Sequence, residues 1–133
     1  MDEVVVKYYR KIIREGCKNT GCIENPSIFL DSVGEKMSIC AKMARSYIKL
    51  FLNVNDSSVI DIKYLCMCDP TANVAVEILC ILVKGKTFNE IKSITEDSFT
   101  KIVGGPSEDL LKRAKGLLEL INIGIERYKT GCS

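Results

Sequence analysis

The sequence contains no histidine and no tryptophan, and only three of its 133 residues are proline. Without histidine, the chain lacks the imidazole ligands on which most hydrolytic zinc sites depend. The same absence excludes a cysteine–histidine pair and a Ser-His-Asp triad, in which the imidazole activates the nucleophile. A glycine-rich phosphate loop and a carboxylate pair in a recognisable motif are also missing. These absences argue against an enzyme that acts by itself, and we expect a non-enzymatic protein.

Strong net charge and long apolar runs are absent as well. The formal net charge of +2 is too small to predict a nucleic-acid-binding or membrane-surface protein. The longest apolar run, residues 74–83, is interrupted by Glu77 and is too short to span a bilayer. The acidic, highly charged beginning does not resemble a secretory signal. We therefore expect one cytoplasmic domain over residues 1–133 that has its own hydrophobic core and does not associate with a membrane.

Two strands around a polar turn are predicted in the middle of the sequence. They cover residues 46–54 and 59–68, and the link Asn55–Ser58 is too short for a parallel crossover. A preceding strand at Met37–Ala41 would complete a three-stranded antiparallel meander within about residues 35–68. The second strand of the hairpin alternates apolar with polar residues, and its expected core-facing residues are Ile60, Ile62 and Tyr64.

Apolar residues at helical spacing dominate the rest of the chain. The predicted helical segments are 2–16, 70–84, 87–94, 96–103 and about 110–128. Asp69 and Pro70 suit the N-cap and the first position of the second segment, and the Asp69 carboxylate is expected to cap it. That helix is apolar almost all round and should be buried. Strands followed by helices indicate an α+β domain, in which the helices pack on one face of the antiparallel meander.

The seven cysteines point to metal binding, cluster binding or sulfur chemistry. In a reducing cytoplasm, cysteines bind metals or clusters, act as reactive sulfur or simply pack, and a single one most often packs as a small hydrophobe. Cys66 and Cys68 differ from a single packed cysteine. Only one residue separates them, so both sulfurs face one side of a strand. The helix expected after them favours the thiolate form, which is the nucleophile and the metal ligand. Thiolates select zinc, copper(I) and iron–sulfur clusters.

A four-coordinate site needs ligands beyond this pair. Cys40 lies on or beside the preceding strand, and Cys22 and Cys17 lie in the loop after the first helix. Cys80 is excluded because a rise of about 1.5 Å per residue places it roughly 15 Å along its helix from Cys68. The candidate metal ligands are therefore Cys40, Cys66 and Cys68, with Cys22 as a further candidate.

Three motifs carry a family resemblance. The buried helix closes in VKGKT at 83–87, the final helix ends in GIERYK at 124–129, and YLCMC at 64–68 follows Cys40 so that Cys66 stands 26 positions after it. This layout resembles the U-type iron–sulfur cluster assembly scaffolds, IscU and the N-terminal domain of NifU. Those proteins have an N-terminal helix, a three-stranded antiparallel meander and then helices. One cysteine ligand lies in the first part of the meander and another just after its third strand.

The resemblance implies a domain that binds an iron–sulfur cluster or zinc on Cys40 and on Cys66 or Cys68. In the family, Gly-Asp follows the first cysteine, and a histidine and a third cysteine begin the last helix. Here alanine and lysine follow Cys40, and alignment from the Tyr-Lys pair places two cations at the start of the last helix. The expected neighbours of this rebuilt thiolate site are Asp69, Lys112 and Arg113.

The resemblance leaves two functions open. The first is a divergent iron–sulfur cluster or sulfur carrier that accepts sulfur or metal on thiolates from a cysteine-desulfurase-like or other pyridoxal-dependent sulfur-transfer enzyme. The alternative is a non-catalytic adaptor that binds a sulfur-transfer enzyme or tRNA without a cluster, as in archaeal tRNA-dependent cysteine synthesis. The basic residues that would touch RNA or an acidic protein surface are Lys7, Arg10, Lys11, Arg14, Lys112, Arg113 and Lys115.

Overall fold

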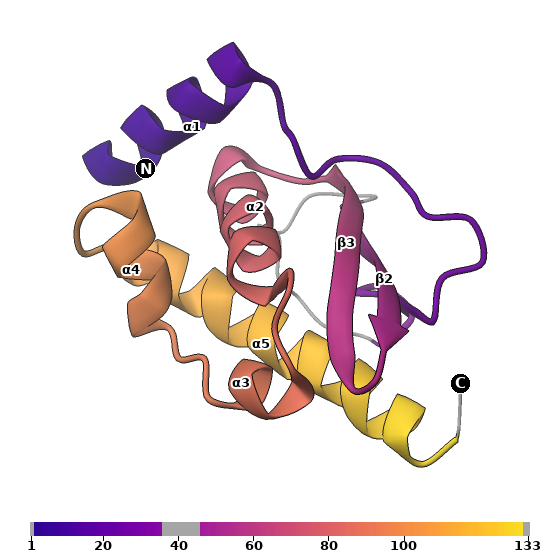
Figure 1. Ribbon diagram of the computed structural model, residues 1–133. Helices are drawn as coiled ribbons and strands as arrows, with labels where there is room; N and C mark the ends of the chain where they lie inside the picture. Colours follow the sequence, from indigo (N-terminus) through magenta and orange to yellow (C-terminus); the bar gives the residue numbers. More distant parts are fainter. Residues whose placement is uncertain (1, 36–45, 132–133) are drawn as a thin grey trace.

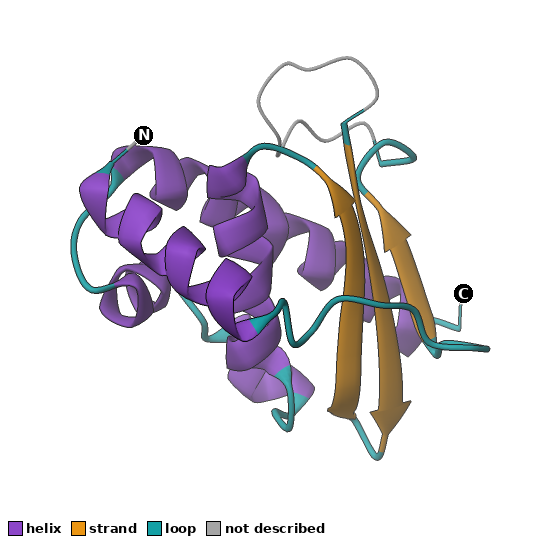
Figure 2. Ribbon diagram, turned by 90° about the horizontal axis from the view of Figure 1, so that it is seen from above, coloured by secondary structure: helices purple, strands orange, loops and turns teal. Residues whose placement is uncertain are grey.

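The computed structural model describes residues 2–35 and 46–131, in which helices pack on one face of a three-stranded antiparallel sheet (Figures 1 and 2). The elements in chain order are α1 (Glu3–Glu15), β1 (Ile28–Asp31), β2 (Tyr47–Asn55), β3 (Ser58–Met67), α2 (Pro70–Val83), α3 (Phe88–Lys92), α4 (Asp97–Val103) and α5 (Glu108–Lys129). The strand order is β1-β2-β3, so the predicted α+β meander is confirmed. Across the described ranges, no helix is both long enough and apolar enough to cross a membrane.

The first strand lies earlier in the chain than predicted. β1 pairs antiparallel with β2, with Ile28 opposite Leu52. The prediction that all three strands lie within residues 35–68 is therefore wrong, and the strand predicted at Met37–Ala41 falls outside the described residues. β1 has only four residues, so its alternation is too short to stand out in the sequence. Burial of Ile28 and Leu30 beneath α5 holds this strand in the sheet.

β2 and β3 form the predicted hairpin around a tight turn. Asp56 and Ser57 in the turn have φ values of 50° and 59°, as a two-residue hairpin turn of the primed type requires. A bulge next to the turn places Val59 opposite Val54, so Ile60 becomes the extra residue and is 53% exposed. The prediction that Ile60 lies on the buried face is wrong, because a bulge reverses the alternation of side chains at that point.

α2 is the central element of the fold. Ten of its 14 residues are buried, and it contacts α1, α4, α5 and β3 (Figure 1). Its far end is tied to the sheet because Gly85, at a φ of 81°, donates its amide to the carbonyl of Val59 at 2.8 Å. The amide of Val59 in turn donates to the carbonyl of Lys86 at 2.9 Å. The VKGKT motif thus joins the end of α2 to the beginning of β3, and the two elements run antiparallel.

The loop after α1 covers the free edge of β3 (Figure 2). The amide of Tyr64 donates to the carbonyl of Asn19 at 3.0 Å, and the amide of Gly21 donates to the carbonyl of Tyr64 at 2.8 Å. Glu77 of α2 anchors the loop, since its Oε1 accepts hydrogen bonds from the amide and the side-chain Nδ2 of Asn19 at 3.1 and 3.0 Å. An exposed edge strand invites pairing with other chains, so this loop both protects β3 and fastens α1 to the sheet.

Gly124 of α5 faces Leu30 of β1 so closely that a methyl group on it would lie 2.7 Å from Leu30 Cδ1. Alanine favours a helix over glycine by about 1 kcal/mol, whereas overpacking a core costs about 1–3 kcal/mol. Because Leu30 is only 2% exposed, we expect Gly124→Ala to lower the free energy of unfolding by about 1 kcal/mol in urea denaturation.

Leu30→Ala provides the matched background for this test. With the leucine removed, Gly124→Ala should be neutral or stabilising, because only the helix propensity then changes. An equal loss of stability in both backgrounds would contradict the close contact between α5 and β1.

Candidate functional site

The two cysteines of the CxC sequence lie where β3 leads into α2. β3 ends at Met67, with Cys66 opposite Ile48 of β2, and α2 begins at Pro70. Cys66 and Cys68 are joined by a disulfide, and their Cα atoms are 5.6 Å apart. Both side chains are half-buried and pack against the core, whereas Met67 between them is 55% exposed. The two sulfurs therefore share one side of the chain.

A guanidinium from the last helix reaches the residue that follows this pair. Arg113 Nη1 lies 2.8 Å from Asp69 Oδ1, and Arg113 Nε lies 3.3 Å from Asp109 Oδ1. The side chains of Arg113 and Asp69 are only 13% and 17% exposed, so water screens their attraction less than it would at the surface. The ion pair fastens the beginning of α5 to the beginning of α2.

The carboxylate of Asp69 does not cap α2 as expected. Asp69 occupies the N-cap position with an extended backbone, but in the part of the chain that the structure describes its side chain makes no capping hydrogen bond. The charged guanidinium of Arg113 offers a stronger bond than a neutral backbone amide would. The charge of Arg113 is in turn shared between two carboxylates, those of Asp69 and Asp109. Lys112, the other predicted neighbour, is exposed.

The other cysteines lie in different surroundings. Cys22 is exposed in the loop that covers the edge of β3, and Cys17 is half-buried in the same loop. Cys80 is fully buried in α2, as predicted. Cys40 and Cys132 lie outside the described residues.

A metal site cannot be assembled from the described ranges alone. Within residues 2–35 and 46–131, no group of three or more cysteine, aspartate and glutamate side chains could hold a metal ion. The sulfurs of a disulfide are also not thiolates, which are the form that binds metals. Zinc or an iron–sulfur cluster would need the reduced Cys66–Cys68 pair together with further ligands such as Cys40, so the ligand set stays a hypothesis.

Glu77 is the polar residue that sequence reasoning missed. It is only 3% exposed and, besides binding Asn19, it lies near Tyr64, whose hydroxyl donates to Asn73 Oδ1 at 3.0 Å. Burial raises the pKa of Tyr64, and the charge of Glu77 adds to the rise. The sequence did carry a signal for Glu77, which is the one acidic residue of a mostly apolar helix. A carboxylate buried in such a helix is rarely left without a partner, so a partner could have been expected.

Solved structures match most of the chain, among them the following three. The N-terminal part of a NifU-like protein from Brucella abortus matches with a TM-score of 0.64 and 11% identity, covering 97% of this chain and 94% of that one. A hypothetical protein matches with a TM-score of 0.59 and 13% identity, covering 91% and 98%. A protein from Fervidobacterium islandicum, described as an iron–sulfur cluster assembly scaffold for the SUF system, matches with a TM-score of 0.52 and 16% identity, covering 97% and 86%. The chain has a U-type scaffold fold. No protein-family model and no curated protein matches its sequence.

The Asp69–Arg113 contact lies at a place where the family resemblance implied cysteine ligands. The family resemblance implied one cysteine ligand after the third strand and another at the beginning of the last helix. In this chain the same two places meet in space, but the last helix contributes a guanidinium bound to a carboxylate. A salt bridge therefore stands in this U-type chain where the resemblance implied a ligand from the last helix.

In the native protein with its disulfide intact, iodoacetamide should modify Cys22 first among the free cysteines that the structure describes, and should leave Cys80 untouched. Cys22 is exposed, whereas Cys80 is fully buried, and burial together with the charge of Glu77 raises the pKa of its thiol. Cys66 and Cys68 should react only after reduction, and peptide mass spectrometry gives the order. Cys80 should react once urea unfolds the protein, and native labelling of Cys80 as fast as Cys22 would contradict the packing of α2.

Removal of the Asp69 carboxylate should destabilise the fold. Among the described residues, Asp69→Ala leaves a mostly buried guanidinium with Asp109 as its carboxylate partner, and we expect a loss of about 1–3 kcal/mol in the free energy of unfolding. In a double-mutant cycle with Arg113→Ala, the two losses should be less than additive.

The exposed pair formed by Glu3 and Lys7 provides the control. Its side chains are 82% and 73% exposed, so Glu3→Ala should cost at most about 0.5 kcal/mol. Fully additive losses for Asp69 and Arg113 would show that their contact does not couple α2 to α5.

Proposed function

We propose that this chain is a divergent carrier of sulfur or of an iron–sulfur cluster that accepts its cargo on thiolates from a cysteine-desulfurase-like, pyridoxal-dependent enzyme. The observation that carries this proposal is the position of Cys66 and Cys68 in a U-type fold, at the junction of β3 and α2. The beginning of a helix favours anions, and therefore favours thiolates over thiols when the pair is reduced.

The number of available ligands favours sulfur as the cargo. A [2Fe–2S] cluster takes four protein ligands, whereas a persulfide needs a single cysteine. The described residues supply one pair of adjacent sulfurs at the junction, together with a salt bridge where a further ligand was implied. Cluster or zinc binding would depend on Cys40 in addition, with Cys22 as a further candidate ligand.

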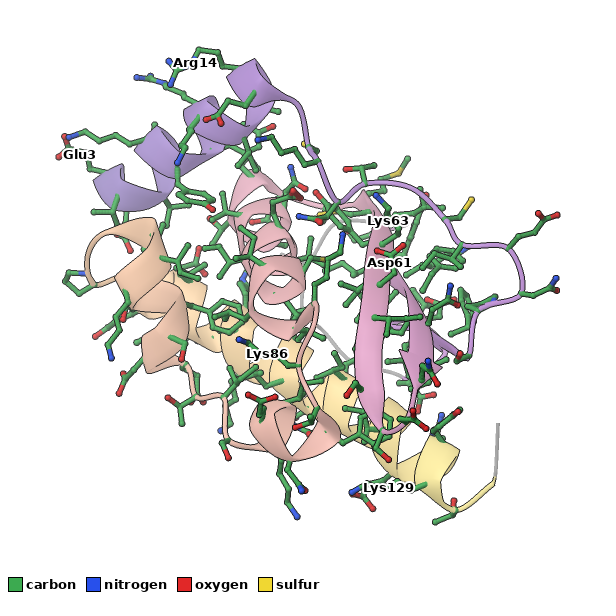
Figure 3. The ribbon with its side chains drawn as sticks, viewed as in Figure 1. Glu3, Arg14, Asp61, Lys63, Lys86 and Lys129 are labelled. Atoms are coloured by element: carbon green, nitrogen blue, oxygen red, sulfur yellow. A yellow bond between two sulfur atoms is a disulfide. The ribbon has the colours of Figure 1, made fainter. Side chains whose placement is uncertain are left out.

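The basic face of α1 favours a second function. Lys7, Arg10, Lys11 and Arg14 are all exposed on α1, and Arg14 points away from the body of the protein (Figure 3). Such a face suits an acidic protein surface or tRNA. The chain would then be an adaptor that binds a sulfur-transfer enzyme or tRNA, as in archaeal tRNA-dependent cysteine synthesis, and would carry no cargo.

Loading by a cysteine desulfurase separates the two functions. We expect the reduced protein, quenched by alkylation soon after mixing with a desulfurase and cysteine, to have gained sulfur atoms as measured by intact mass. Cys66→Ser with Cys68→Ser should abolish this gain and leave the circular dichroism spectrum unchanged, because serine is nearly isosteric with cysteine.

Cys17→Ser is the matched control, since it removes a half-buried thiol from a loop and should load like the wild type. If the double variant loads as well as the wild type, or if neither loads, the carrier function is wrong and the adaptor function stands.

A further inference from the structure

We propose that the Cys66–Cys68 pair releases its cargo by closing a disulfide, so that the chain itself supplies the two electrons that convert carried sulfur into sulfide. This inference rests on the proposed carrier function and adds how the sulfur leaves. The observation behind it is that the two cysteines are bonded to each other at the site where sulfur would be received.

The disulfide is compatible with the elements on either side of it. The β2–β3 ladder continues through Cys66 opposite Ile48 to Met67 opposite Tyr47, and α2 begins at Pro70. The Cα separation of 5.6 Å lies within the range of about 4.4–6.8 Å that disulfides adopt. The end of β3 therefore accommodates the bonded pair without interrupting the β2–β3 ladder.

The release step balances in atoms and electrons. The desulfurase donates the terminal sulfur of its own persulfide to one cysteine of the pair, which becomes a persulfide. The thiolate of the second cysteine then attacks the inner sulfur of that persulfide. A new Sγ–Sγ bond forms, the bond to the terminal sulfur breaks, and the terminal sulfur leaves with the bonding electrons as hydrosulfide. The two cysteines are oxidised to a disulfide and the terminal sulfur is reduced to sulfide.

The geometry makes the second cysteine of the pair the natural attacking group. Its Cα lies 5.6 Å from that of its partner, and a thiolate held this close acts at a high effective concentration. Cys80 cannot be the attacking thiol because it is fully buried. Cys22 is exposed in the loop that pairs with the edge of β3 at Tyr64, two positions before Cys66.

The charges of Asp69 and Arg113 affect how easily hydrosulfide can form beside Cys68. Asp69 follows Cys68 directly, and its negative charge would oppose the formation of hydrosulfide beside it. Arg113 Nη1 lies 2.8 Å from the Asp69 carboxylate and offsets that charge. A salt bridge at this place suits the departure of an anion better than an uncompensated carboxylate would.

A further round of release requires a reductant from outside the chain. A cellular dithiol, either a small molecule or a thioredoxin-like protein, would attack the disulfide and return both cysteines to thiols by exchange. In its oxidised form the Cys66–Cys68 pair should not accept sulfur, because a disulfide offers no thiolate.

The experiment follows a single round of release. Reduced protein is loaded by a desulfurase under anaerobic conditions, separated from enzyme, cysteine and reductant, and then monitored for free sulfide and intact mass. We expect the wild type to release one sulfide for each persulfide and to gain a Cys66–Cys68 disulfide, located by peptide mapping. Of the single variants Cys66→Ser and Cys68→Ser, the one that still loads should release sulfide at least about tenfold more slowly. Cys17→Ser should release sulfide at the wild-type rate.

The outcomes separate this inference from the function on which it rests. If the loaded wild type keeps its persulfide, or if the single variant that loads releases sulfide as fast as the wild type, closure of the disulfide is not the release step, although the carrier function stands. Loss of release in Cys17→Ser would also overturn the inference, because Cys17 would then be the attacking thiol. If no variant and no wild-type protein loads, the carrier function itself fails.

Discussion

A helix that is apolar on nearly every side cannot remain at a protein surface, and the burial of α2 is the constraint on which the other elements depend. It is enclosed by α1, α4, α5 and β3, and its two ends are fixed by different means. At one end the VKGKT segment pairs with the beginning of β3. At the other end β3 stops at Met67, and only Cys68 and Asp69 separate it from Pro70. The position of the CxC sequence therefore follows from the packing of the core.

Two buried or half-buried acids attach the outer elements to this centre. Glu77 holds the loop after α1 through both nitrogens of Asn19, and Asp69 holds α5 through Arg113. A carboxylate removed from water must recover its lost hydration through hydrogen bonds, so each acid makes its partner segment hard to displace. These contacts bring α1 and α5 to the same helix that positions the cysteines. Any partner that docks on those helices would bind elements attached to the helix that follows the cysteines.

Periodicity was sufficient to predict the helices, the β2–β3 hairpin and the fold class, because each of these signals extends over many residues. It failed where the signal was short or non-local. β1 has four residues and is held by burial beneath α5, and a bulge turned Ile60 outward against its alternation. The Asp69–Arg113 pair joins residues 44 positions apart. The Asp69 carboxylate accepts a hydrogen bond from that guanidinium and does not cap the backbone amides at the beginning of α2. The family resemblance placed Arg113 near the CxC sequence, but only the three-dimensional packing identifies its partner.

A U-type fold does not by itself determine the chemistry of the site. A U-type fold brings the end of the third strand and the beginning of the last helix together, and that closeness can serve a cluster held by ligands from both elements. In this chain the last helix supplies a cation already engaged by carboxylates, and two sulfurs at the end of β3 lie close enough to bond with each other. A pair of adjacent thiols offers two electrons and one acceptor for sulfur, which is sufficient for a sulfide-releasing carrier without four ligands. The geometry at the end of β3 therefore fits the proposed sulfur carrier, which needs one acceptor thiol and one neighbouring thiol.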